Sequence, residues 1–143
     1  MSDMSYFESR KGMVSSSAKE FYIFVTDLRN FERFVPEKSV KNWLADKELC
    51  TFNVPMAGTI KVRIAVKSAY TLVSFEGDAL NKNDFLLSLL IDEKGDNLAE
   101  VQISLKADLN PMLKMMASKP IEQFLEMMIV QMENFREWGN VTV

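Results

Sequence analysis

The stretch Asn110–Gly139, NPMLKMMASKPIEQFLEMMIVQMENFREWG, decides the fold. Asparagine followed by proline is typical of a helix start, because the asparagine side chain caps the first turn and proline has no N–H to leave unpaired. We expect the helix to end at Trp138-Gly139. Its apolar residues recur at steps of three and four and therefore share one face: Met112, Met115, Met116, Phe124, Leu125, Met128, Met132 and Phe135. A curved sheet closed by this face would enclose an apolar pocket, so the helix favours a ligand-binding fold.

Pro120 lies inside this helical segment. It lacks the N–H that would bond the carbonyl of Met116, and its ring crowds that carbonyl. We therefore expect one long helix with a kink at Pro120. The alternative is a separate second helix that begins near Pro120, with Ser118 as its cap.

The segments before this helix alternate apolar and polar residues, which is typical of antiparallel strands with one dry and one wet face. In Thr59–Ser68, for example, valine and isoleucine alternate with lysine and arginine. The six predicted strands are Val40–Asp46, Glu48–Val54, Thr59–Ser68, Thr71–Gly77, Asp84–Asp92 and Asn97–Asp108. Turns are expected between them, and in the turn at 92–97 we expect Gly95 to supply a positive φ.

Another strand, Tyr6–Val14, and two short helices come first in the chain. Ser17 with a glutamate three residues later is a capping-box pattern and predicts a helix at Ala18–Thr26. The second helix, Arg29–Phe34, ends before a proline, because the residue preceding proline disfavours the helical region. Asp27 is predicted to cap this second helix, and a catalytic role is its alternative.

The first strand places charges on both of its faces. Glu8 and Arg10 share one face, and Ser9 and Lys11 share the other. Whichever face turns inward brings a charge towards the core, and a buried unpaired charge is costly. We therefore expect that charge to reach the rim of the fold or to find a partner.

The order strand, two helices, six strands and one long helix predicts an α+β fold built as one domain, residues 1–143. We expect a curved antiparallel sheet of about seven strands wrapped on the C-terminal helix, with two short helices after the first strand. The hydrophobic share of 48% is enough for a full core.

Two stretches resemble the START-like helix-grip superfamily, which includes polyketide cyclase-like (SRPBCC) proteins, plant pathogenesis-related allergens and lipid-transfer domains. One is Val14–Pro36, VSSSAKEFYIFVTDLRNFERFVP, in which an aspartate leads into a short second helix and then a proline; the other is the C-terminal helix. The resemblance covers nearly the whole chain and implies a helix-grip fold. It also implies a hydrophobic ligand, lipid or polyketide-like, between sheet and helix, with cyclisation or dehydration in some members. No catalytic signature of the family can be transferred to residues of this chain.

Composition excludes several kinds of site. The chain has no histidine and one cysteine, Cys50. Ser-His-Asp and Cys-His catalysis are therefore impossible, and zinc sites built on histidine or several cysteines are excluded. We predict no cofactor and no metal. A lone cysteine forms no internal disulfide, and the N-terminus lacks an apolar signal segment, so we expect a cytoplasmic protein. Cys50 is expected to be a buried small apolar residue.

Charge and hydropathy limit the partners. The net charge is −3, and Lys61, Arg63 and Lys67 alternate along one strand as a solvated outer face would. Nucleic-acid binders usually carry a strong basic patch, so we expect no nucleic-acid partner. No apolar run is long enough to span a membrane. The expected partner is a small hydrophobic molecule.

Strand phase and the helix face predict the residues that line the ligand pocket. They are Trp43, Phe52, Val54, Ile64, Val66, Val73, Phe75, Phe85, Leu87, Leu89, Val101, Ile103, Leu105, Met112, Met116, Phe124, Met128 and Met132. The alternative is that these side chains fill the core and leave no cavity, because protein interiors pack densely.

Two other functions stay open from the sequence. One is an enzyme of the cyclase or dehydratase type, which without histidine would use carboxylates, tyrosine or arginine in the same pocket. The other is a non-catalytic module that forms a homodimer. Leu86 and Leu90 lie opposite Phe85 and Leu87 in strand phase, and an exposed pair of leucines is typical of an interface.

Overall fold

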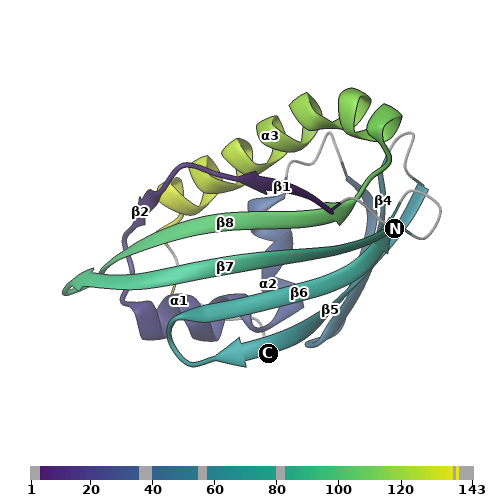
Figure 1. The fold of residues 1–143 in the computed structure, drawn as a ribbon. Coiled ribbons are helices and arrows are strands. Elements are labelled where there is room, and N and C mark those ends of the chain that lie inside the picture. Colours follow the sequence, from purple (N-terminus) through teal and green to yellow (C-terminus); the bar gives the residue numbers. More distant parts are fainter. Residues whose placement is uncertain (1–3, 36–39, 55–57, 80–82, 137, 139–143) are drawn as a thin grey trace.

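The computed structural model describes residues 4–35, 40–54, 58–79, 83–136 and 138 of the chain. One antiparallel sheet of eight strands curves around the long helix α3 (Pro111–Asn134) (Figure 1). The short helices lie on the same concave side, α1 against β6 and β7 and α2 against β3 and β4. The strand order is β1-β8-β7-β6-β5-β4-β3, and β2 also pairs with β8. This is the predicted helix-grip α+β fold.

The element bounds follow the predicted segments closely. The strands are β1 (Met4–Glu8), β2 (Gly12–Val14), β3 (Lys41–Ala45), β4 (Leu49–Val54), β5 (Gly58–Ser68), β6 (Leu72–Ala79), β7 (Asn83–Gly95) and β8 (Leu98–Asp108). The short helices are α1 (Ala18–Val25), α2 (Leu28–Phe31) and the 3-10 turn η1 (Glu32–Phe34). The predicted first strand is thus two strands, and the predicted second helix is α2 followed by η1.

The predicted helix caps are confirmed. The side chains of Ser17, Asp27 and Asn110 accept hydrogen bonds from backbone N–H groups in the first turns of α1, α2 and α3. α3 continues through Pro120 as a single helix, so the alternative of two helices is wrong. It ends at Asn134 and not at the predicted Trp138-Gly139, because Phe135 is already extended, with ψ 139°.

Two local predictions about the strands are wrong. A register shift between Ile64 and Val66 on β5 reverses the alternation, so Val66 points outward and is 46% exposed. In the turn between β7 and β8, Asn97 adopts the positive φ, at 53°, which was expected of Gly95. Asparagine tolerates this region because its short polar side chain bonds locally.

Five aromatic rings close one end of the space between sheet and α3. This closed end is formed by Phe21, Phe24, Phe34, Phe135 and Trp138, with ring centroids 4.7 to 5.7 Å apart. They come from α1, η1 and the segment after α3. Aromatic pairs at these tilted and edge-on angles are favourable beyond the area they bury. After α3 ends at Asn134, Phe135 and Trp138 therefore pack into the closed end.

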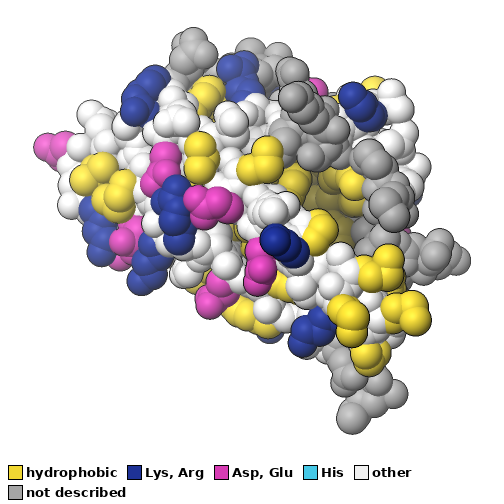
Figure 2. Space-filling model, turned by 90° about the horizontal axis from the view of Figure 1, so that it is seen from above, with side chains coloured by type: hydrophobic (Ala, Val, Ile, Leu, Met, Phe, Trp, Pro, Cys, Tyr) yellow, Lys and Arg dark blue, Asp and Glu magenta, His cyan; other side chains and the backbone are white. Residues whose placement is uncertain are grey.

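The outer surface mixes charges of both signs. On the face seen from above in Figure 2, basic and acidic side chains are interspersed, and neither sign forms a large patch. This agrees with the small net charge of −3. In the part of the chain that the structure describes, no helix is long and apolar enough to cross a membrane.

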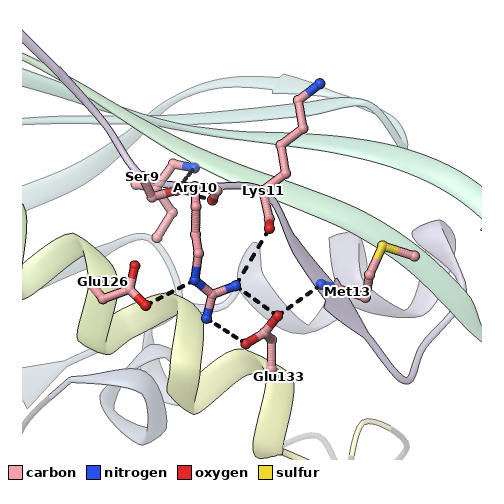
Figure 3. Close-up of polar contacts among 7 residues, drawn as sticks. Ser9, Arg10, Lys11, Met13, Glu126 and Glu133 are labelled. Atoms are coloured by element: carbon pink, nitrogen blue, oxygen red, sulfur yellow. Dashed lines mark hydrogen bonds and ion pairs between the residues drawn. The ribbon is translucent and has the colours of Figure 1, made fainter.

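A bulge between β1 and β2 determines where the charged side chains of the first strand point. From Glu8 to Gly12 the strand advances four positions, while its partner β8 advances three, from Ser104 to Val101. Ser9 faces inward in phase with Ser5 and Phe7, and its hydroxyl accepts a hydrogen bond from the Ile103 N–H at 2.9 Å. The extra residue then reverses the alternation, so Gly12 and Val14 face inward on β2. Arg10 is therefore free to turn out of the strand towards α3 (Figure 3).

Arg10 links the sheet edge to two carboxylates of α3 (Figure 3). Its Nε donates to Glu126 at 2.9 Å, and its two terminal nitrogens donate to Glu133 at 2.7 and 3.0 Å. Glu133 also accepts the backbone N–H of Met13 at 3.2 Å. The hydrogen bond from Arg10 lowers the pKa of Glu133. The expected charge on the first strand thus finds its partner on the helix.

We predict that Gly77→Ala destabilises the fold. A Cβ at Gly77 would lie 2.1 Å from the carbonyl oxygen of Lys61 and 3.0 Å from the Phe85 ring, so β5 or the ring must move. The free energy of unfolding should fall by about 1–3 kcal/mol, as for overpacking, measured by urea denaturation. Gly95→Ala is the control, since no atom lies within 4 Å of its Cβ position, and it should change stability by less than about 0.5 kcal/mol. Equal stability of both variants would contradict the close approach.

We predict that Glu133→Gln lowers stability by up to about 1 kcal/mol near neutral pH, because the ion pairs with Arg10 are partly exposed. The pKa of Glu133 is lower in the folded than in the unfolded protein, so its contribution is present above the ordinary glutamate pKa of about 4.3 and disappears as pH falls through the folded value. Denaturation of wild type and variant at several pH values should give curves that converge in acid. The exposed Glu122→Gln on the same helix is the control and should show no such convergence.

Candidate functional site

The inner apolar face is fully buried at one end of the fold and only partly buried at the other. On β7, Leu89 is fully buried whereas Phe85 and Leu87 are partly exposed. On the neighbouring β8, Ile103 is fully buried whereas Leu105, the partner of Leu87, is partly exposed. The change occurs at the level of the Leu87–Leu105 pair on both strands, while Ala107 beside Phe85 and Phe75 beside Leu87 stay buried. The partial exposure at this end therefore belongs to the large side chains Phe85, Leu87 and Leu105.

α3 shows the same change along its length. Its buried residues begin at Leu125 and continue to Met132, in the half that packs towards the closed end. Before Leu125, the residues Leu113, Ile121 and Phe124 are only partly buried. Because β8 runs directly into the start of α3, the first half of the helix lies over the partly exposed ends of β7 and β8 (Figure 1).

We call this region the open end and define it by partly buried apolar side chains that pack against the core. They are Trp43, Phe52, Ile60, Ile64, Phe85, Leu87, Leu105, Leu113, Ile121 and Phe124. Seen from above, the surface is hollowed on the side where the first half of α3 lies, and hydrophobic side chains form the visible floor of the hollow (Figure 2). Concave apolar surfaces of this kind are typical of ligand sites.

Trp43 and Phe52 stack at the β3–β4 edge of the open end. Their ring centroids are 5.0 Å apart and the ring planes are inclined by 14°. The indole Nε1 of Trp43 is buried, and within the described residues it has no hydrogen-bond partner. The two rings give this wall a flat aromatic surface and one unpaired donor.

The predicted pocket residues divide into three groups. Fully buried in the core are Val73, Phe75, Leu89, Val101, Ile103, Met128 and Met132. Partly buried are Trp43, Phe52, Val54, Ile64, Phe85, Leu87, Leu105 and Phe124. Exposed are Val66, Met112 and Met116, the two methionines at 72% and 60%. The prediction that these three face inward is wrong.

The helix face explains the two methionines and two residues that the prediction missed, Leu113 and Ile121. Leu113, Ile121 and Phe124 turn towards the sheet, so Met112 and Met116 point away from it. Leu113, Ile121 and Phe124 are eight and then three residues apart, a helical spacing that would have identified this apolar stripe. Ile60 was also missed, although it pairs with Phe52 across β4 and β5.

Two ionisable groups considered from the sequence have structural roles. Asp27 caps α2 and accepts two hydrogen bonds from the Arg29 side chain, at 2.9 and 2.6 Å, which lower its pKa. Burial raises the pKa of the Cys50 thiol to about 12, so it is a protonated apolar residue at neutral pH, as predicted. A search among the described residues finds no cluster of acidic or cysteine side chains that could hold a metal ion.

No protein-family model matches the chain, and no curated protein matches its sequence. Solved structures do match its fold. The protein XoxI from Bacillus cereus superposes with a TM-score of 0.70 at 10% identity, over 90% of this chain and 93% of its own. Norcoclaurine synthase from Thalictrum flavum gives 0.67 at 11% identity, over 92% of this chain and 86% of its own.

A START superfamily protein from Mycobacterium smegmatis superposes with a TM-score of 0.61 at 14% identity, over 91% of this chain and 97% of its own. At identities this low, the structural likeness establishes a shared fold. It does not establish a shared activity. The sheet order, the long C-terminal helix and these likenesses agree, and the chain has the START-like helix-grip fold.

Proposed function

We propose that this protein binds a small hydrophobic molecule at the open end, between the sheet and the first half of α3. The observation that carries the proposal is the change from full to partial burial along β7, β8 and α3. Partly exposed apolar side chains that face one another across a hollow forgo part of the roughly 25 cal/mol per Å² that burial provides. A hydrophobic ligand that covers them would recover it, less the cost of ordering the ligand.

Two features support a ligand over a filled core. The closed end is already packed by five aromatic rings, so the fold does not need the open end to complete its core. The walls of the open end come from β3, β4, β5, β7, β8 and α3, and their side chains are aliphatic or aromatic. A lipid or polyketide-like molecule fits such walls, in line with the fold resemblance.

The structural neighbours are consistent with small organic ligands. One structure of Thalictrum flavum norcoclaurine synthase, which matches this chain with a TM-score of 0.61 at 8% identity, is in complex with dopamine and hydroxybenzaldehyde. A site for small aromatic molecules is therefore compatible with this fold.

Catalysis in the same site would require an ionisable group directed into it. The described carboxyl groups with a lowered pKa, Asp27 and Glu133, are each paired with an arginine, which favours their charged form. They are poor proton donors for that reason. We therefore place the binding role ahead of the cyclase or dehydratase role. The single cysteine is buried as a free thiol, which supports a reducing compartment such as the cytoplasm.

A homodimer through the outer face of the sheet stays a prediction. Leu90 is 43% exposed on that face, and Leu86 is partly buried there. Light scattering across a wide concentration range would test it, and a monomer at the highest concentration would count against it.

We predict that wild-type protein binds N-phenyl-1-naphthylamine, a neutral apolar fluorophore, and that Leu87→Trp abolishes most of this binding. The larger ring would fill the open end, so the affinity should fall by about tenfold or more in a fluorescence titration. Leu90→Trp is the matched control, because Leu90 lies three residues further along β7 on the outer face, and its affinity should equal that of wild type. The proposal fails if wild type binds no probe or if both variants bind equally well.

Native mass spectrometry of protein purified from its own cells would identify the ligand class. We expect a bound species below the size of a peptide that leaves when the protein is unfolded and extracted with organic solvent. Protein carrying Leu87→Trp should retain little of that species. Equal retention by the variant would place the species outside the open end.

A further inference from the structure

The indole N–H of Trp43 is a buried donor without an acceptor in the described chain. Buried polar groups in native proteins are nearly always hydrogen-bonded, and each exception calls for an explanation. Buried tryptophan usually finds a partner for its N–H. The ring of Trp43 belongs to the wall of the open end, so its unpaired N–H lies where a ligand would bind.

Trp138 provides an internal comparison, since its Nε1 is also buried without a conventional partner. Trp138 lies among aromatic faces, edge-on to Phe24 at 76° and to Phe135 at 85°. An N–H that points at a ring face makes a weak hydrogen bond to it, so an edge-on environment suits an indole donor. Trp138 therefore has aromatic rings beside it, at angles that allow its N–H to meet a ring face.

The same explanation does not serve Trp43. Its one described ring contact is with Phe52, and the two rings are nearly parallel, at 14°. The N–H bond lies in the plane of the indole, so it runs alongside the Phe52 ring and does not point at its face. A different acceptor is needed for this donor.

The surroundings limit what that acceptor can be. The side chains that define the open end are all uncharged, and those of the strands next to Trp43 are Phe52, Ile60 and Ile64. An ionised carboxylate would lose its hydration here without gaining a cation among these residues, which is costly. A carbonyl, hydroxyl or ether oxygen loses much less and can accept one N–H.

We infer that the ligand is a neutral hydrophobic molecule with an oxygen acceptor, and that Trp43 Nε1–H donates to that oxygen while the Trp43–Phe52 stack forms the wall beside it. This rests on the proposed function and names the ligand class of the same site. Trp43 is then a specificity-determining residue, since a site built to donate a hydrogen bond discriminates against ligands that lack the acceptor.

The test uses a matched pair of ligands, 1-tetralone and tetralin, which differ by one carbonyl oxygen. Both are titrated into wild-type protein and Trp43→Phe by displacement of N-phenyl-1-naphthylamine. Phenylalanine keeps an aromatic ring against Phe52 and removes the donor together with part of the ring area, and tetralin reports the effect of the lost area alone. We expect Trp43→Phe to lower the affinity for 1-tetralone by about fivefold, which is the usual net effect of one neutral hydrogen bond. The affinity for tetralin should change by less than about twofold.

A second measurement needs no variant to fold. The chain has two tryptophans, so a ¹⁵N-labelled sample gives two indole N–H signals. 1-Tetralone should move the Trp43 signal downfield, and tetralin should not. Suppose that both ligands bind wild type but shift the Trp43 signal by the same amount, or that Trp43→Phe lowers the affinity for both ligands equally. Either result overturns the inference about Trp43, while the proposed function stands. If the probe binds but neither ligand displaces it, the inference about Trp43 is overturned and the proposed function stands. If no probe binds, both are overturned.

Discussion

The packing of aromatic rings at the closed end is the constraint on which the rest of the structure depends. Phe24 of α1 and Phe34 of η1 meet Phe135 and Trp138 from the segment after α3, with Phe135 and Trp138 centroids 4.7 Å apart. This contact fixes three parts of the chain that are distant in sequence, and it fixes α3 only at its C-terminal end. The other half of the helix is held by its junction with β8, so the fold can close completely at one end and stay open at the other.

Much of the fold follows from local sequence signals. The caps at Ser17, Asp27 and Asn110 satisfy N–H groups within their own first turns, so no distant contact is needed to recognise them. The antiparallel strands are also predictable from local sequence, because a strand with one wet and one dry face alternates polar and apolar residues with a period of two. The misses depend on long-range contacts. Val66 is reversed by a shift in its pairing with β6, and after α3 ends Trp138 packs on α1 and η1, elements distant in sequence.

The candidate site was predictable in its strands and less so in its helix. α3 carries two apolar stripes that overlap, one with Met112 and Met116 and one with Leu113 and Ile121. Helical periodicity alone predicts either stripe as the buried one. Only the packing of α3 against the sheet shows that the stripe with Leu113 and Ile121 faces inward. The distinction between a closed and an open end was also out of reach, because it depends on which aromatic residues gather together. Trp43 was named from strand phase, whereas its unpaired donor is a property of its surroundings.

An open end has a thermodynamic consequence for the whole domain. Side chains such as Phe85 and Leu87 contribute less to stability than they would if fully buried, so the unliganded fold forgoes free energy that a ligand can supply. A molecule that binds only the folded state stabilises it in proportion to RT ln(1 + [L]/Kd). The closed end must therefore be stable enough alone to hold the walls in place before the ligand arrives. Its dense aromatic packing and the Arg10 link between the sheet edge and α3 contribute to that stability away from the site.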